Sequence, residues 1–202
     1  MMLIRKYDKP ALWNGTQKEL YKGALFFADG FFSELKTTNN TLSVWVVENA
    51  DDRKEIDSVV GALALGRESV QKISFMILSK EKMDKLGIPV TTELGDAPGL
   101  EEDDELRKRH RNLSELDYYR MGYVIELMTN IAHGEEDGMK CESRTRKEVF
   151  GILRDLIEVQ KRVDMNKMNE KLKTDYLKAK ENFEKEEQFK KNKEARKAQK
   201  SK

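Results

Sequence analysis

Cysteine and histidine are scarce in this sequence, which contains one cysteine, Cys141, and two histidines among its 202 residues. A single cysteine cannot form an internal disulfide, and no CxxC motif or Cys/His cluster has the spacing of a zinc site. Neither His110 nor His133 has a serine, cysteine or carboxylate partner at a spacing typical of a catalytic group. The sequence therefore excludes a disulfide-stabilised scaffold and indicates no metal centre built on these residues.

Long hydrophobic runs are also missing. The longest, such as residues 24–28, are far too short to span a bilayer. Residues 1–8 lack the apolar core of a signal peptide. The motifs GxxxxGK[ST], GxGxxG, GxSxG and HExxH are all absent. We therefore expect a cytoplasmic protein without a membrane partner, and no motif names a reaction.

Charged residues, in contrast, are abundant. They make up 37% of the chain, whereas about 25% is typical of globular domains. Positive and negative charges nearly cancel, with a formal net charge of +1. No global field therefore attracts nucleic acid or acidic lipid, and any such attraction must be local.

Four capping patterns predict where helices begin. In each, Ser, Thr or Asp precedes an acidic residue by three positions, so that each side chain can accept from a free backbone N–H. The pairs are Thr16 with Glu19, Asp52 with Glu55, Ser114 with Asp117, and Thr145 with Glu148. They predict helices over about 17–28, 53–68 and 115–132 and from 146 onward, although residues 24–28 can also be interpreted as a strand.

Four β-rich segments accompany the first two of these helices, over residues 3–7, 31–37, 42–47 and 72–78, and residues 88–94 are expected as an additional edge strand. Residues 42–47 are apolar on both faces, which predicts a central strand. The Asn-rich turn before them predicts a hairpin with residues 31–37. The order of strands and helices predicts an α+β fold whose N-terminal βαββαβ domain has the ferredoxin-like order.

The distribution of charge and apolar residues predicts the domain organisation. The expected parts are an α+β domain over 1–94, an acidic and then basic linker over 95–112, a helical hairpin with a long charged arm over 113–189, and a basic, disordered tail over 190–202. From Arg146, apolar steps of three and four predict one continuous helix to about Phe189.

The helical arm supports the first functional hypothesis. Its apolar stripe, typical of a seam with another helix, includes Ile152, Leu156, Val159 and Val163. The rest of the chain provides too few apolar residues to cover a helix of this length. We therefore expect a non-enzymatic interaction or assembly protein, without a cofactor, that uses the arm to dimerise or to bind a protein partner.

Two basic clusters support an alternative function, nucleic-acid binding. One precedes a predicted helix start, where arginines and free N–H groups can bind anions, and the other lies at the C-terminus, where cations can contact phosphates. The residues are Arg107, Lys108, Arg109 and Arg111 in the first cluster and Lys190, Lys191, Lys193, Arg196 and Lys197 in the second. Solvated surface charge is the competing interpretation of both clusters.

An enzymatic alternative is based on Asp29, Glu34 and Lys36. The sequence Glu34-Leu35-Lys36 with an upstream acid resembles the pattern of PD-(D/E)xK metal-dependent nucleases. The resemblance implies carboxylates that hold Mg²⁺ and a lysine that orients the attacking water. Asp29 stands closer to Glu34 than this pattern requires, and E-x-K triplets arise readily in a chain rich in Glu and Lys.

Overall fold

In the part of the chain that the structure describes, six strands form one antiparallel sheet. The structure, a computed structural model, describes residues 1–8, 13, 35, 37, 39–100 and 103–200, without the side chains of residues 104 and 195–200. The strands are β1 (Met2–Tyr7), β2 (Leu42–Val47), β3 (Ile73–Ser79), β4 (Val90–Thr92), β5 (His110–Leu113) and β6 (Lys140–Arg144). The α-helices are α3 (Arg53–Leu65), α4 (Lys80–Lys85), α5 (Asp104–Arg107), α6 (Tyr118–Ala132), α7 (Arg146–Arg154) and α8 (Glu170–Lys200). The predicted α+β class is confirmed.

The strands are arranged in the order β4-β5-β2-β1-β3-β6, and every neighbouring pair is antiparallel. The strand β2 is central, as its apolar character predicts, and Val44 and Val47 are fully buried on opposite faces. The edge strand β4 has three residues, and the other edge strand, β6, carries charged residues. Short or charged edges of this kind limit pairing with the edge of another sheet.

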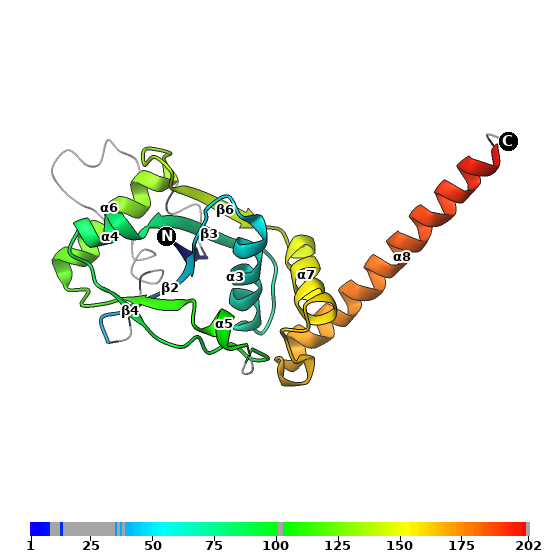
Figure 1. Cartoon of the computed structure of the whole chain (residues 1–202), viewed down its shortest axis with the longest axis horizontal. Helices are drawn as coiled ribbons and strands as arrows, with labels where there is room; N and C mark the ends of the chain where they lie inside the picture. Colours follow the sequence, from blue (N-terminus) through cyan, green and yellow to red (C-terminus); the bar gives the residue numbers. More distant parts are fainter. Residues whose placement is uncertain (9–12, 14–34, 36, 38, 101–102, 201–202) are drawn as a thin grey trace.

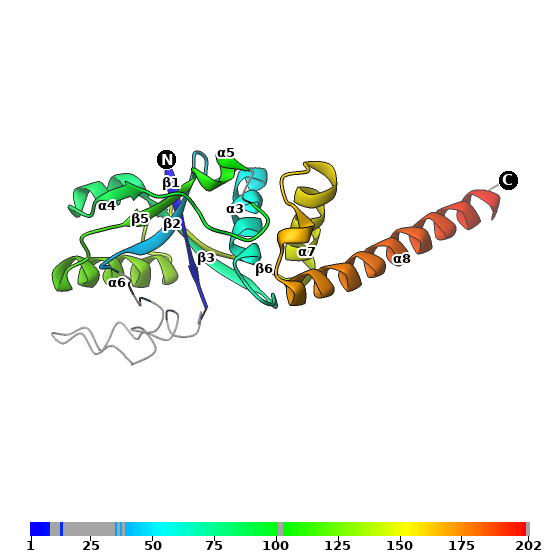
Figure 2. The same ribbon diagram turned by 90° about the horizontal axis from the view of Figure 1, so that it is seen from below.

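Helices cover both faces of the sheet (Figures 1 and 2). On one face, α3, α7 and the first part of α8 pack over strand residues such as Ile4 and Phe75. On the other face, α6 and the short helix α4 pack over residues such as Leu3 and Val46. Because both faces are covered, the strands β2 and β3 bury residues in both directions.

Three of the helix starts show how well capping residues predict local structure. Asp52 accepts from the backbone N–H groups of Lys54 and Glu55 at the start of α3, and Thr145 forms a complete capping box with Glu148 at the start of α7. The start at Ser114 is wrong by a few residues, because Asp117 is the N-cap of α6. The Thr16 start lies outside the described residues.

Strand β2 pairs with β1 on one side and with β5 on the other. Most of residues 31–37, the other strand of the predicted hairpin, lies outside the described residues. The ferredoxin-like order is not confirmed by this sheet.

The segment expected to be a linker, 95–112, contributes to the folded core. It contains α5 and most of β5, and β5 bonds to both β2 and β4. Leu100 and Leu106 are fully buried against the α3 side of the sheet. The burial of these two leucines stabilises the folded segment although most of its residues are polar, because each leucine removes a large apolar side chain from water.

The prediction of one continuous helix from Arg146 is wrong. Helix α7 ends at Arg154 and continues as a π-helical turn, Asp155–Val159. The chain then reverses through residues 160–169, where Lys161 has a positive φ of 54°. Helix α8 starts afresh at Glu170, with the Asn169 side chain accepting from the backbone N–H groups of Lys171 and Leu172.

The reversal is held by contacts with the loop that precedes α5. The N–H of Asp164 donates to the carbonyl of Gly99 over 2.9 Å. The Arg162 guanidinium donates to the Asp103 carboxylate over 3.0 Å. Val163 and Met168 are buried beside them. Tertiary contacts therefore override the helical spacing of the sequence, and they do so without a proline or glycine in residues 155–169.

Helix α7 and the π-helical turn that follows it approach α3 closely at Gly61. A β-carbon placed on Gly61 would lie 2.2 Å from Cδ1 of Leu156 and 3.3 Å from Cγ2 of Ile152. Leu156 is itself 1% exposed and has little room to move. The missing side chain at position 61 is therefore what allows α7 to lie on α3.

We predict that Gly61→Ala destabilises the protein by about 1–3 kcal/mol, because the added methyl group overpacks this contact. The matched control is Gly122→Ala in α6, where a β-carbon would meet no atom within 4 Å. That control should stabilise the protein by up to about 1 kcal/mol, since alanine favours helix. Urea unfolding of both variants tests the contact, and a Gly61→Ala variant as stable as Gly122→Ala would contradict it.

Candidate functional site

The first half of α8 is docked on the domain. Leu172 and Tyr176 are buried, and Ala179 and Phe183 are partly buried against the same core as α7. These residues follow one another in steps of four, three and four, which places them on one face of the helix. The apolar stripe of α8 is thus used within the chain.

A polar contact between the π-helical turn and α8 strengthens this docking. The Tyr176 hydroxyl donates to the Glu158 carboxylate over 2.8 Å, and the Lys180 ammonium lies 2.6 Å from the same carboxylate. The contact with Lys180 lowers the pKa of Glu158. Burial, together with the hydrogen bond to Glu158, raises the pKa of the Tyr176 hydroxyl. The tyrosine therefore stays protonated and remains a donor at neutral pH.

Ion pairs mark the end of the docked half. Lys147 pairs with Glu186 at 2.7 Å, and Arg154 pairs with Glu187 at 2.8 Å. The Arg154 guanidinium also stands over the Phe183 ring, 5.2 Å from its centroid. At the stripe positions after Phe183, charged residues of α8 thus face α7.

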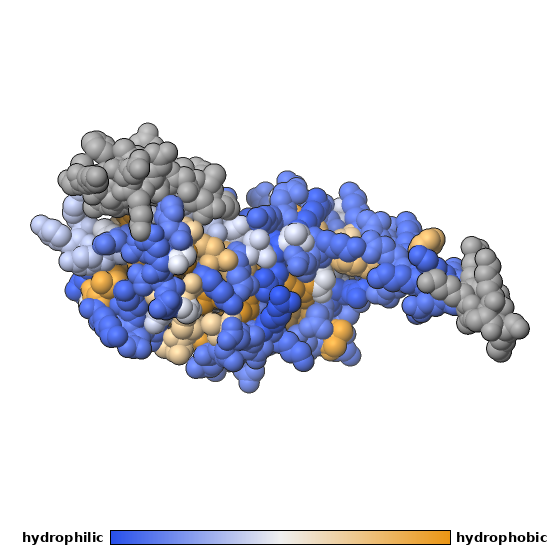
Figure 3. Space-filling view, turned by 90° about the horizontal axis from the view of Figure 1, so that it is seen from above, coloured by the Kyte–Doolittle hydropathy of each residue, from blue (hydrophilic) through white to orange (hydrophobic). Residues whose placement is uncertain are grey.

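The second half of α8 projects from the domain (Figure 1). Phe189 is 69% exposed, and Lys190, Lys191 and Lys193 are exposed as well. Residues 190–200 contain six Lys or Arg residues and one acid, over a length of about 16 Å at 1.5 Å per residue. Figure 3 shows that the described surface of this region is almost entirely hydrophilic. We name residues 188–200 the cationic arm.

The cationic arm includes the residues predicted to bind nucleic acid at the C-terminus. Lys190, Lys191 and Lys193 lie on a helix, whereas a disordered tail was expected from residue 190. Arg196 and Lys197 belong to the same helix by their backbone. The exposed lysines present their charge to solvent, away from the core of the domain.

The predicted partner interface is mostly internal. Leu156 and Val163 are buried, and Ile152 is partly buried against the core beside α3. Val159 is the exception and is 73% exposed. Because α3 and the reversal 160–169 cover Ile152, Leu156 and Val163, the burial of these three residues does not require a second chain.

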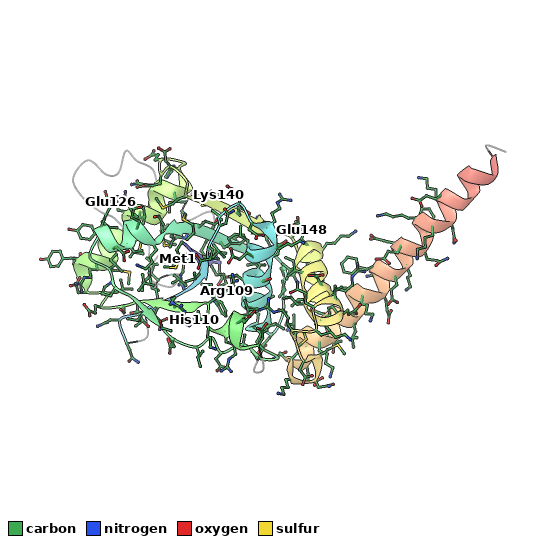
Figure 4. All side chains as sticks on the ribbon, viewed as in Figure 1. Met1, Arg109, His110, Glu126, Lys140 and Glu148 are labelled. Atoms are coloured by element: carbon green, nitrogen blue, oxygen red, sulfur yellow. The ribbon has the colours of Figure 1, made fainter. Side chains whose placement is uncertain are left out.

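The side chains of the basic cluster 107–111 have separate partners in the structure. The Arg107 Nε donates to the Gly95 carbonyl over 3.0 Å, Arg109 pairs with Glu55, and Arg111 donates to the His110 carbonyl over 2.7 Å. Lys108 is exposed between them. Figure 4 shows Arg109 and His110 next to each other near α5, well apart from the end of α8. The arginines hold the loops of this domain, and they do not gather at the start of α6.

The residues of the nuclease hypothesis, Asp29, Glu34 and Lys36, lie outside the described residues, and that hypothesis remains a prediction. Within the part that the structure describes, no three His, Cys, Asp or Glu side chains are grouped so that they could hold a metal ion. In the same part of the chain, no helix has the length and the apolar character needed to cross a membrane.

Comparisons with protein-family models, with curated proteins and with solved structures found no match to this chain.

Leu156 and Val159 of the π-helical turn test whether the predicted partner interface packs within the fold or contacts another chain. We predict that Leu156→Asp costs more than about 4 kcal/mol, because it buries a charge in a packed core. Val159→Asp should change stability by less than about 0.5 kcal/mol, as expected at an exposed site. Chemical unfolding and light scattering measure both variants. A change of oligomeric mass on Val159→Asp would instead make this position an interface.

Proposed function

We propose that this chain is a cytoplasmic binding protein that uses the cationic arm to contact nucleic acid through its phosphate backbone. The observation that carries the proposal is the separation of the two halves of α8. The apolar residues of the first half pack on the domain, whereas the second half is exposed to solvent and rich in Lys and Arg.

Pairing with a second copy of the arm is less favourable than contact with a polyanion. A helix seam needs apolar residues every three or four positions, and Phe189 is the one large apolar residue of the cationic arm. Two copies would also bring their cations together, which costs electrostatic free energy. We therefore expect a monomer in solution.

The spacing of phosphates in a nucleic acid allows several cations of the arm to contact phosphates together. Duplex DNA carries one phosphate charge for about each 1.7 Å of its axis, and each cation that neutralises a phosphate releases a counterion. An arm about 16 Å long can therefore bring several lysines near phosphates at once. Aromatic side chains for stacking on bases are sparse, since Phe189 is the one aromatic residue of the arm, so contact with the backbone is expected to dominate.

We predict that replacing Lys190, Lys191 and Lys193 with glutamine weakens binding to a fluorescent DNA duplex and reduces its salt dependence. Each lost phosphate contact should lower the slope of log K against log salt by about 0.9, so the total reduction is about 2–3. Fluorescence anisotropy between 50 mM and 200 mM salt, roughly the range over which such contacts matter, measures the slope.

The matched control replaces Lys171, Lys178 and Lys185, three exposed lysines of the first half of α8, with glutamine. It removes the same charge and should leave most of the salt slope in place. Equal losses in the two triple variants would show that only net charge matters. No binding by the unmodified chain at low salt would exclude the proposal, and would direct the search for a ligand of the arm to acidic proteins.

A further inference from the structure

A second charged feature is a cavity of about 240 Å³ beside the C-terminal end of α3. Trp45 of β2 and His110 of β5 line one side, Gly66 and Arg67 line another, and residues 96–97 complete it. The volume is slightly below the 300–1,000 Å³ typical of ligand pockets, so any ligand must be small.

The floor of the cavity is fixed by the strand register. Trp45 is the direct partner of His110 across β2 and β5. Their rings form an edge-to-face pair with centroids 5.2 Å apart. Gly95 lies close against them, because a β-carbon there would be 2.7 Å from Cη2 of Trp45. Trp45 is 6% exposed, so neighbouring groups cover most of it.

Three cations line the cavity beside this floor, namely Arg5, Lys6 and Arg67, with Asp96 as the one acidic lining residue among those described. Burial lowers the pKa of the Lys6 ammonium, the contact with Asp8 raises it, and the nearby charges of Arg67 and Arg5 lower it, so that the net shift is downward. Positive charges held close together in a partly buried site repel one another. A bound anion would relieve this repulsion.

Asp8 shows what kind of group these cations accept. Its carboxylate pairs with the Lys6 ammonium at 3.0 Å and also with the Arg67 guanidinium. Yet the Asp8 side chain is 53% exposed and stands at the end of β1, beyond the last residue of the strand. Asp8 therefore shows that the two cations can bind an oxyanion together at a partly exposed site.

His110 adds a neutral polar group to the same wall. Its Nδ1 lies 3.2 Å from the Glu93 carbonyl, and a carbonyl oxygen can only accept, so Nδ1 carries the hydrogen. Burial lowers the pKa of the His110 imidazole. The ring is therefore neutral at pH 7, and its other nitrogen is an acceptor that can receive a hydroxyl of a ligand.

We propose that this cavity binds the phosphate group of a small phosphorylated molecule, with Lys6 and Arg67 as the main ligands in place of Asp8. A phosphate is favoured over a single carboxylate because three cations line the cavity and a dianion neutralises more of their charge. Arginine binds phosphate through two parallel N–H groups, which fixes orientation as well as charge. This binding is independent of the cationic arm, which lies on another part of the molecule.

The experiment is a titration of the full chain with inorganic phosphate, followed by NMR of the His110 ring and the Trp45 indole at constant ionic strength. Acetate is the matched carboxylate probe. His133, the other histidine of the chain, is an internal control for general salt effects. The expected result is a saturable shift of the His110 and Trp45 signals with phosphate, a weaker one with acetate, and no shift of His133.

Two variants are expected to change the affinity for phosphate in opposite directions. Arg67→Gln should weaken phosphate binding about tenfold, since it removes a charge-assisted hydrogen bond. Asp8→Asn should strengthen binding, because it removes the competing carboxylate, and a loss of folding cannot imitate a gain. Lys147→Gln, which removes a cation of α7 outside the cavity, should change nothing. Absence of a saturable shift, a shift unaltered in Arg67→Gln, or a weaker affinity in Asp8→Asn would overturn the proposal.

Discussion

Leu156 of the π-helical turn reaches the backbone of α3 because Gly61 has no side chain, and the positions of several other elements depend on that contact. It lays α7 against α3 and ends the helix within one further turn. The reversal 160–169 can then reach the loop at Gly99. From there α8 begins close to the core, where Leu172 and Tyr176 are buried. A single close approach between helices thus determines where the arm leaves the domain.

The two halves of α8 differ in what they contact. The apolar residues up to Phe183 pack on the domain, and the ion pairs of Glu186 and Glu187 with α7 follow them. The residues beyond have no comparable apolar side chain except Phe189. Positive and negative residues are therefore distributed unevenly along the chain. The arm is locally positive although the net charge of the whole chain is only +1.

The sequence predicts those features that depend on neighbours in the chain. The caps at Asp52 and Thr145 and the central strand β2 are recognisable because capping and two-sided apolar strands are local patterns. The strands β5 and β6 were missed, since both carry charged residues and owe their conformation to pairing with β2 and β3. The end of α7 was also missed, although Asn169 is a legible N-cap for a new helix.

The candidate sites show the same limit. The lysines of the cationic arm are visible as a run in the sequence, so they could be listed before the fold was known. The cavity proposed to bind phosphate could not, because Lys6, Arg67 and His110 are far apart in the chain and meet only through the register of the sheet and the end of α3. Likewise, the apolar stripe of α7 resembles an interface until the reversal shows that α3 already covers it.

Hydrogen exchange along α8 tests the central claim most directly, that its first half is docked on the domain and its second half is not. The account predicts slow exchange of the backbone amides from Leu172 to Phe183, where the helix is packed, and fast exchange beyond Glu187, where it is exposed. Both rates should be independent of protein concentration. Slow exchange through to Lys200 would contradict the account, because it would mean that the arm is covered by the domain or by a second copy.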